Sequence, residues 1–216
     1  MTKRTVTAFK WVPPFAKGLV RDLRVRWALE EAGLPYDVRL ISHEEKESPE
    51  YRALQPFAQV PVYIEDGVDL FESGAIVLNI AEQSETLLPK DPKARIKAIS
   101  WMFAALNSVE GVVQQLATID LFYPNEAWAK ERRPEVVTMI ERRLAAVADR
   151  LGDKDYLEGS FSAGDLLMAT VLRILRHTDL VAGQPKLAAY LARCEARPAF
   201  QKALAGQLAD LDEEAA

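Results

Sequence analysis

The hydrophobic pattern of this 216-residue chain changes near residue 90, and that change limits the folds open to it. Before this point short β-like runs alternate with helical runs, whereas after it almost every run is helical. The pattern predicts an α/β domain followed by an all-α domain. Because Pro89 and Pro92 punctuate the transition, we expect domains at 1–84 and 92–216 with a linker at 85–91.

The first domain is predicted to have the element order βαβαββα. "VTAFKW" alternates like a strand, and "LVRDLRVRWALEEAG" is a helical run with Gly33 as its stop. "PYDVRLI" is a second strand, followed by a short helix with Ser48 as N-cap and Pro49 at the first helical position. Two further strands turn at Asp66 and Gly67, since an Asp-Gly pair favours a tight hairpin.

The second domain is predicted from long amphipathic runs at 93–122, 126–151, 163–180 and 184–206. In "FSAGDLLMA", Ser162 and Asp165 have the spacing of a capping box. In such a box, each of the two side chains accepts a hydrogen bond from a backbone N–H at the start of the helix. We assign this pair a structural role and no chemistry.

Charge and cysteine content exclude several classes of function. The 27 Lys and Arg against 32 Asp and Glu give a net charge of -5, so we expect no nucleic-acid partner and no polybasic membrane anchor. No run of about 18 uninterrupted apolar residues is present, and we expect no membrane span. A single cysteine, Cys194, excludes an intramolecular disulfide and favours a cytoplasmic location.

The segment "QPFAQVPVYIEDGVDLFESGAIVLNIAE" resembles the glutathione S-transferase superfamily, whose members show N-P-x-G-x-V-P, a hairpin, and then E/Q-S and a helix. The resemblance covers the whole chain, because the Pro-rich linker and "FSAGDLLMATVL" follow in the family's order. It implies a thioredoxin-like first domain, an all-helical second domain, a homodimer, and glutathione as co-substrate.

Val60 and Pro61 are the first site residues that the resemblance implies. The family pattern has a cis peptide bond between them, which would present the backbone N–H and C=O of Val60 outward. The cysteinyl part of glutathione would pair with these groups as an added strand. Without the flanking motifs, a proline that ends a strand would be the simpler interpretation.

Glu72 and Ser73 stand where a strand ends and a helix begins. A helix N-terminus favours a carboxylate, and a nearby acid can hold an ammonium group. The resemblance implies that Ser73 binds the γ-glutamyl carboxylate and that Glu72 faces its amino group. Ser73 is also a candidate N-cap of the helix, and an ordinary cap after an exposed glutamate is the structural alternative.

The glycyl carboxylate of glutathione requires a cation or hydrogen-bond donors. Lys46 and Gln59 are the candidates, although Lys46 lies in the charge run "HEEKESPE", where a solvated surface is an equally good explanation. His43 is a further donor candidate. We find no spacing of acidic and histidine residues that predicts a metal site.

The loop "FKWVPPFAKGLVRDL" departs from the family pattern. Catalytic members stabilise the glutathione thiolate with a Tyr, Ser or Cys after the first strand, and residues 9–35 contain none of these. Lowering a thiol pKa of about 8.5 by two units takes about 2.7 kcal/mol of thiolate stabilisation. We hypothesise that Arg21, with Lys17 and the N–H groups near the helix start, supplies it in place of a hydroxyl.

The predicted function is attack of the glutathione thiolate on a small hydrophobic electrophile. One alternative is a glutathione-dependent peroxidase or disulfide-bond reductase, and another is a protein that binds glutathione or an apolar ligand without turnover. Cys194 lies in the helical half, so a mechanism with a cysteine in the first loop is excluded. The stiff segment "WVPPF" is a candidate wall for the electrophile, or packs on the helical domain.

Overall fold

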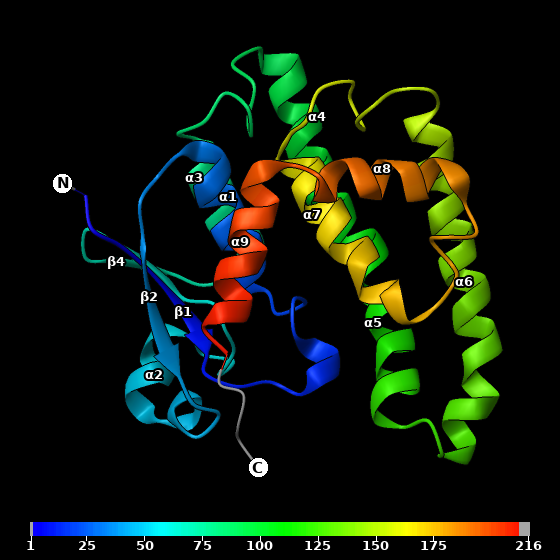
Figure 1. Ribbon diagram of the computed structural model, residues 1–216, viewed down its shortest axis with the longest axis horizontal. Helices are drawn as coiled ribbons and strands as arrows, with labels where there is room; N and C mark the ends of the chain where they lie inside the picture. Colours follow the sequence, from blue (N-terminus) through cyan, green and yellow to red (C-terminus); the bar gives the residue numbers. More distant parts are fainter. Residues whose placement is uncertain (1, 212–216) are drawn as a thin grey trace. The chain divides into compact units, whose positions relative to one another are not determined.

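The computed structural model describes residues 2–211. The chain divides into two compact units. Unit 1 comprises Met1–Leu87 and Arg197–Ala216, and unit 2 comprises Leu88–Ala196. The division after Leu87 falls inside the expected linker, but the last helix within residues 2–211 belongs with the sheet of unit 1. Figure 1 shows the elements of each unit along the chain.

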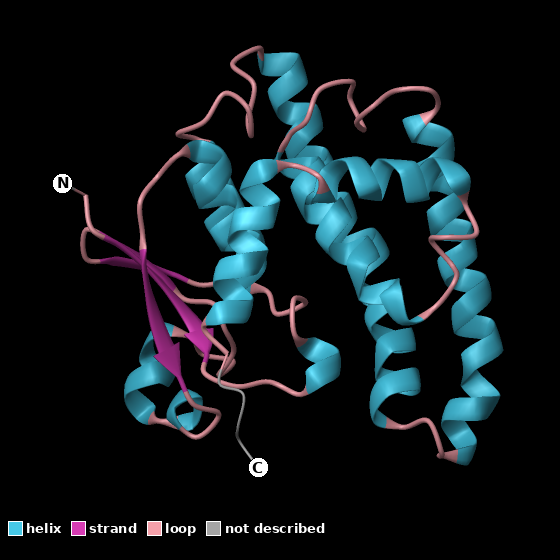
Figure 2. Cartoon of the chain, in the orientation of Figure 1, coloured by secondary structure: helices cyan, strands magenta, loops and turns pink. Residues whose placement is uncertain are grey.

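Unit 1 contains a mixed sheet with helices, and its order confirms the predicted βαβαββα arrangement. Its elements are β1 (Arg4–Phe9), η1 (Pro14–Ala16), α1 (Asp22–Ala32), β2 (Asp37–Ile41), η2 (Glu45–Glu47), α2 (Pro49–Leu54), β3 (Tyr63–Glu65), β4 (Val68–Leu70), α3 (Ser73–Ala81) and α9 (Pro198–Ala209). The strand order is β2-β1-β3-β4, with β1 and β2 parallel and the other pairs antiparallel. Figure 2 shows the strands of this sheet in magenta. This is the thioredoxin-like arrangement.

Local sequence signals set several of these boundaries. Ser48 caps α2, because its side chain accepts the Tyr51 N–H at 3.1 Å. Asp66 and Gly67 have φ values of 49° and 85°, so both central residues of the hairpin turn are left-handed as the predicted turn requires. Gly33 ends α1 with φ 66°.

Three sequence-based boundaries are wrong. The first strand is displaced toward the N-terminus, ending at Phe9. Ser73 is not the N-cap of α3 but its first residue, and Glu72 occupies the cap position. The run 184–206 is two helices, because Pro198 lacks an N–H and starts a new helix at its first position.

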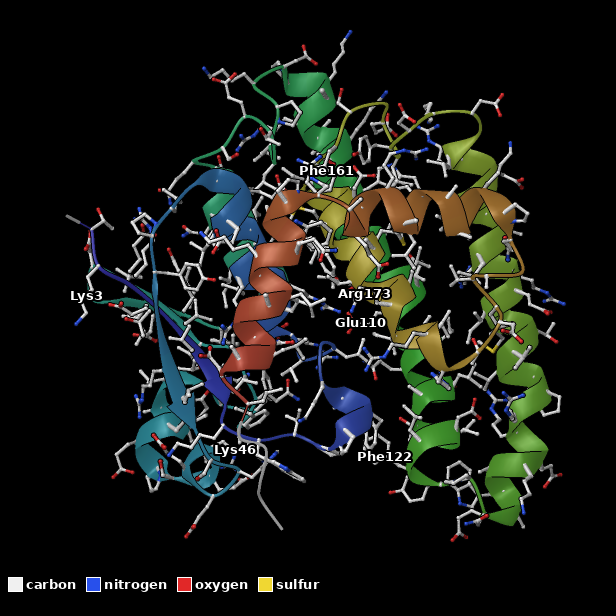
Figure 3. The ribbon with its side chains drawn as sticks, in the orientation of Figure 1. Lys3, Lys46, Glu110, Phe122, Phe161 and Arg173 are labelled. Atoms are coloured by element: carbon white, nitrogen blue, oxygen red, sulfur yellow. The ribbon has the colours of Figure 1, made fainter. Side chains whose placement is uncertain are left out.

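Unit 2 is all helical, as predicted. Its elements are α4 (Pro92–Phe103), η3 (Ala104–Glu110), α5 (Gly111–Ala117), η4 (Thr118–Phe122), α6 (Ala127–Leu151), α7 (Ala163–Arg173), η5 (Ile174–His177) and α8 (Pro185–Glu195). The η3 and η4 segments are π-helical turns within one continuous helix, Pro92–Phe122. In Figure 3, Glu110 of η3 and Arg173 of α7 lie on segments that pack together in this unit.

The helix Pro92–Phe122 is long and apolar enough to cross a membrane when only length and composition are considered. Helices in the cores of soluble proteins meet the same criteria, so a single helix of this kind is weak evidence for a span.

The start of α7 is held by several side-chain hydrogen bonds. Ser162 accepts the Gly164 N–H at 3.2 Å, and Asp165 accepts the Ser162 N–H at 3.0 Å, which confirms the predicted capping box. Asp165 also accepts the Leu157 N–H at 2.9 Å and the Tyr190 hydroxyl at 3.0 Å. Burial raises the pKa of the Asp165 carboxyl, and these donors oppose that rise.

Candidate functional site

The loop before β3 presents backbone groups that an extended ligand can pair with. The bond between Val60 and Pro61 is cis, as the family resemblance implies. No hydrogen bond within residues 2–211 involves the N–H or C=O of Val60. The side chain of Gln59 is exposed, while Val60 and Pro61 are buried. An unpaired donor and acceptor on one residue is what β-strand addition requires.

Two buried hydroxyls hold this loop against the sheet. The Tyr51 hydroxyl donates to the Gln59 carbonyl at 2.8 Å, so its oxygen accepts the Thr7 hydroxyl at 3.0 Å. The Thr7 Oγ1 in turn accepts the Val62 N–H at 2.7 Å. Burial raises the pKa of the Tyr51 hydroxyl. Both hydroxyls therefore have structural partners and cannot serve a thiolate.

An apolar cluster joins this loop to the segment that precedes α1. Its buried members are Ile41, Tyr51, Val60 and Val62. Partly buried side chains packed against it include Val20, one residue before Arg21. The structure thus brings the first loop and the Val60 loop together through a shared apolar contact.

The first loop has no hydroxyl or thiol that can reach a ligand. Lys17 ends the short η1 turn, and Arg21 is the N-cap of α1, with both residues half-buried. Tyr36, the next hydroxyl along the chain, donates to Glu30 at 3.3 Å. Burial and the Glu30 charge raise the pKa of Tyr36 to about 12, so it remains protonated near neutral pH.

The start of α3 lacks a side-chain cap. Glu72 stands at the N-cap with φ 67° and makes no cap hydrogen bond, and the first backbone bond runs from the Ile76 N–H to the Glu72 carbonyl at 2.9 Å. The preceding N–H groups of the first turn therefore remain available to a ligand. Non-glycine residues with such a φ are uncommon and often lie at functional sites.

Arg24 is a buried cation beside Ser73 that sequence reasoning missed. Its Nη1 donates to the Ser73 Oγ at 3.2 Å, and both residues are almost fully buried. Arg21 and Arg24 are three residues apart in the first turn of α1, so they occupy neighbouring positions on that helix. Two cations at α1 and the positive end of α3 make this region favourable for an anion.

A sequence signal for Arg24 exists but is weak. Every residue of α1 from Asp22 to Leu29 is buried, so the helix is covered on all sides. Amphipathic periodicity assigns charged residues to an exposed face and therefore gives no indication that Arg24 is enclosed.

The structure does not connect Lys46 with the other predicted site residues. Lys46 lies on η2, and Figure 3 labels it in the part of unit 1 that carries this turn. Its ammonium group forms an ion pair with Glu47. His43 stacks on Phe9 with ring centroids 4.3 Å apart, and its Nε2 lies 3.3 Å from the Trp11 carbonyl oxygen. Both interactions are structural explanations for these two residues.

The one cysteine of the chain and its possible metal ligands are the other candidates for reactive groups. Cys194 is buried in α8 of unit 2 and forms no disulfide within the described chain. Among residues 2–211, no group of three His, Cys, Asp or Glu side chains is arranged to hold a metal ion.

Comparison with known proteins identifies the family. The N-terminal domain model of glutathione S-transferases matches residues 7–82, and the C-terminal domain model matches residues 115–198. Glutathione S-transferase F14 of Arabidopsis thaliana is 30% identical over 82% of this chain and 76% of the relative. A glutathione S-transferase of Hyoscyamus muticus is 30% identical over 84% of this chain and 92% of its own length. The chain belongs to the glutathione S-transferase family.

Solved structures agree with this assignment. A glutathione transferase from Burkholderia graminis, crystallised with two glutathione molecules per subunit, is 28% identical with a TM-score of 0.80. The match covers 94% of this chain and 87% of that chain. Glutathione transferase F7 of Populus trichocarpa, at 21% identity and a TM-score of 0.81, shows the same fold.

Proposed function

We propose that this protein is a glutathione transferase that joins the glutathione sulfur to a small hydrophobic electrophile. The observation that carries the proposal is the start of α3, where an uncapped helix N-terminus adjoins Ser73 and the buried Arg24. This arrangement suits the γ-glutamyl carboxylate, which would accept from the Ser73 hydroxyl and from N–H groups of the first turn. Glu72, exposed at the cap position, would face the γ-glutamyl ammonium group.

The cysteinyl and glycyl parts of glutathione would extend toward the loop before β3, which contains Gln59 and Val60. The cysteinyl backbone would donate to and accept from Val60, whose N–H and C=O have no partner within residues 2–211. Gln59, exposed beside Val60, is the preferred donor for the glycyl carboxylate. Lys46 is the weaker candidate, because its ammonium group is already paired with Glu47.

Arg21 would stabilise the thiolate, with Lys17 as a second cation. Arg21 stands at the positive end of α1, and no hydroxyl in this segment competes for the role. In the reaction, the thiol proton leaves to solvent and the thiolate sulfur attacks an electrophilic carbon. The new C–S bond forms as the leaving group departs with its electron pair, or as a conjugate acceptor takes up a proton.

Binding and thiol titration together test this proposal. We expect calorimetry to detect glutathione binding and ultraviolet thiolate absorbance to show a lowered thiol pKa in the complex. Arg21→Ala should raise that pKa by about one unit or more and lower turnover of an activated aryl halide about tenfold or more. Arg39→Ala is a matched control, because Arg39 is an exposed arginine of β2 paired with Glu45. Unchanged pKa and turnover in Arg21→Ala would contradict the role of Arg21.

A second candidate function is reduction of disulfides by glutathione. The Burkholderia graminis relative holds two glutathione molecules per subunit, which is the number such a reaction consumes. One glutathione thiolate would attack a substrate disulfide and release a thiol, and a second would attack the mixed disulfide to form glutathione disulfide. Turnover of a disulfide substrate without turnover of electrophiles would favour this function, and binding without either activity would favour a carrier.

We further propose a cytoplasmic homodimer with a role in detoxification. Each unit exposes large apolar side chains, including Phe57 and Phe71 in unit 1 and Ile96 and Phe103 in unit 2. The Phe57 and Phe71 rings lie 6.2 Å apart and form an exposed aromatic pair. Such residues favour a protein interface. Light scattering on the intact chain and on Phe57→Ser tests it, and a monomeric wild-type protein would contradict it.

A further inference from the structure

The amide of Gln207 in α9 holds the residues on both sides of Arg21. Its Nε2 donates to the Val20 carbonyl at 3.2 Å and to the Asp22 Oδ1 at 2.7 Å. Gln207 is almost fully buried, with 2% of its surface exposed. The last described helix therefore contacts the start of α1 through hydrogen bonds rather than through apolar packing alone.

These bonds belong to a larger network between α1 and α9, which is buried except at Asp210. The second oxygen of Asp22 accepts from the Arg26 Nε at 2.8 Å, and the Arg26 Nη1 donates to Asp210 at 2.7 Å. Burial raises the pKa of the Asp22 carboxyl, while the Arg26 charge and its hydrogen bond oppose that rise. Two residues of α1, one turn apart, thus face two residues at the C-terminal end of α9.

The network is an inefficient way to stabilise two packed helices. The Gln207 Oε1 and the Arg26 Nη2 are buried and have no hydrogen-bond partner within residues 2–211. A partly satisfied polar network is less favourable than an apolar contact of the same volume. What the polar groups provide in return is a fixed position for the Val20 carbonyl and the Asp22 carboxylate.

Val20 connects the Gln207 hydrogen bonds to the loop that contains Val60. Its carbonyl accepts from both Leu23 N–H, at 3.0 Å, and Gln207, while its side chain packs against the cluster that contains Val60. A displacement of Val20 would therefore affect Arg21 and the Val60 loop together.

We propose that Gln207 is a positioning residue that fixes the start of α1 and thereby sets where the Arg21 guanidinium stands with respect to the glutathione thiol. The inference rests on the proposed function, because it assigns Gln207 an effect exerted through Arg21. Gln207 itself makes no contact with glutathione in this scheme.

The test is Gln207→Met, which keeps the length of the side chain and removes the amide. We expect the thiol pKa of bound glutathione to rise by about one unit and kcat to fall about tenfold, because small displacements of a catalytic group have large effects on rate. The dissociation constant for glutathione should change less than about threefold, since the Ser73 region is untouched. Gln207→Asn, which keeps an amide but shortens the reach, gives the same readouts if Gln207→Met does not fold.

Lys202→Met is the matched control. It removes the exposed ion pair between Lys202 of α9 and Glu30 of α1 at 2.7 Å and leaves the start of α1 intact. If Gln207→Met lowers the melting temperature but leaves the thiol pKa and kcat as in Lys202→Met, Gln207 is merely structural and the inference is overturned.

The Arg21→Ala background separates this inference from the proposed function. Adding Gln207→Met there should not raise the thiol pKa further, and a fully additive rise would overturn an effect through Arg21. If the wild-type protein binds no glutathione or does not lower its thiol pKa, the proposed function fails and this inference fails with it. If the wild-type protein lowers the pKa and Gln207→Met does so equally, only the inference fails.

Discussion

The helices α3 and α7 both begin beside a serine, but the two starts are built in opposite ways. At α7, Ser162 and Asp165 bond to each other's backbone and the cap is buried. At α3, Glu72 makes no cap bond, and the Ser73 hydroxyl receives a hydrogen bond from Arg24 instead. The α7 start satisfies its own N–H groups, whereas the α3 start leaves N–H groups available to an external acceptor.

The difference separates a helix start that contributes to stability from one that, under the proposed function, contributes to binding. A closed cap contributes to the free energy of unfolding and offers nothing to a ligand. An open start with a residue at unfavourable φ costs stability and is retained where a ligand completes it. Substitutions at the two starts should therefore have different consequences.

The largest effect is expected from Asp165→Ala. The Asp165 carboxylate accepts from Leu157, Ser162 and Tyr190, so its loss leaves several buried donors without an acceptor. We expect the free energy of unfolding to fall by about 3–5 kcal/mol, measured by urea denaturation.

Ser162→Ala is the control for Asp165→Ala within the same cap. It removes one acceptor and should lower the free energy of unfolding by about 1 kcal/mol. Equal losses in the two variants would show that the Asp165 contacts outside the capping box contribute little.

Ser73→Ala should affect glutathione binding more than it affects the free energy of unfolding. We expect glutathione affinity to fall by about 1.5–3 kcal/mol, because a hydrogen bond to a charged carboxylate is lost. The free energy of unfolding should fall by about 1–2 kcal/mol, less than in Asp165→Ala, because only the Arg24 Nη1 loses an acceptor. Calorimetry and urea denaturation on the same sample measure both quantities. A loss of stability without a loss of affinity would remove the contrast between the two helix starts.

Acid should weaken the segment that leads into α7. Burial alone would raise the pKa of the Glu158 carboxyl. Hydrogen bonds from Arg150, Trp101 and Lys97 outweigh burial and lower this pKa from 4.5 to about 2. A lowered folded-state pKa contributes stability that is present above about pH 4.5 and is lost as the pH falls toward 2. We expect a contribution of about 1–2 kcal/mol, because exposed partners weaken the pairs.

Glu158→Gln checks the origin of this pH dependence. Denaturation between about pH 2 and 4.5 should show a shallower loss of stability in the variant than in the wild-type protein. Parallel curves would assign the acid sensitivity to other carboxylates.

The smallest effect is expected at Glu72, where the open start has a cost in backbone conformation. Glu72→Gly should raise the free energy of unfolding by about 0.5–1 kcal/mol, because glycine accepts φ 67° without a Cβ penalty. The same variant should lose glutathione affinity along with the carboxylate. Glu72→Ala is the control, since it should lose affinity without gaining stability.

Sequence patterns predicted the parts of the fold that rest on short-range chemistry. The Asp66 and Gly67 turn, the Ser48 cap of α2 and the Ser162 and Asp165 box each depend on residues a few positions apart. The family, both domain classes and the cis bond before Pro61 followed from motifs in the expected order.

The parts that could not be predicted depend on tertiary enclosure. Arg24 and Gln207 look like exposed residues of amphipathic helices, and only the packing of α1 against its neighbours buries them. The cap position of α3 was misplaced by one residue, because serine usually caps helices and here Glu72 adopts the unusual φ. The π-helical turns η3 and η4 likewise have no simple sequence signature.

The hydrogen bond from Arg24 to Ser73 gives the hydroxyl a direction. Because a guanidinium can only donate, it occupies a lone pair of the Ser73 oxygen and its charge turns the hydroxyl hydrogen away. Ser73 would therefore act toward a ligand as a donor. A ligand group that carries its own hydrogen would be disfavoured at this oxygen by the nearby positive charge of Arg24. Under the proposed function, the polarity of this buried pair would favour a carboxylate over an ammonium group at the Ser73 oxygen.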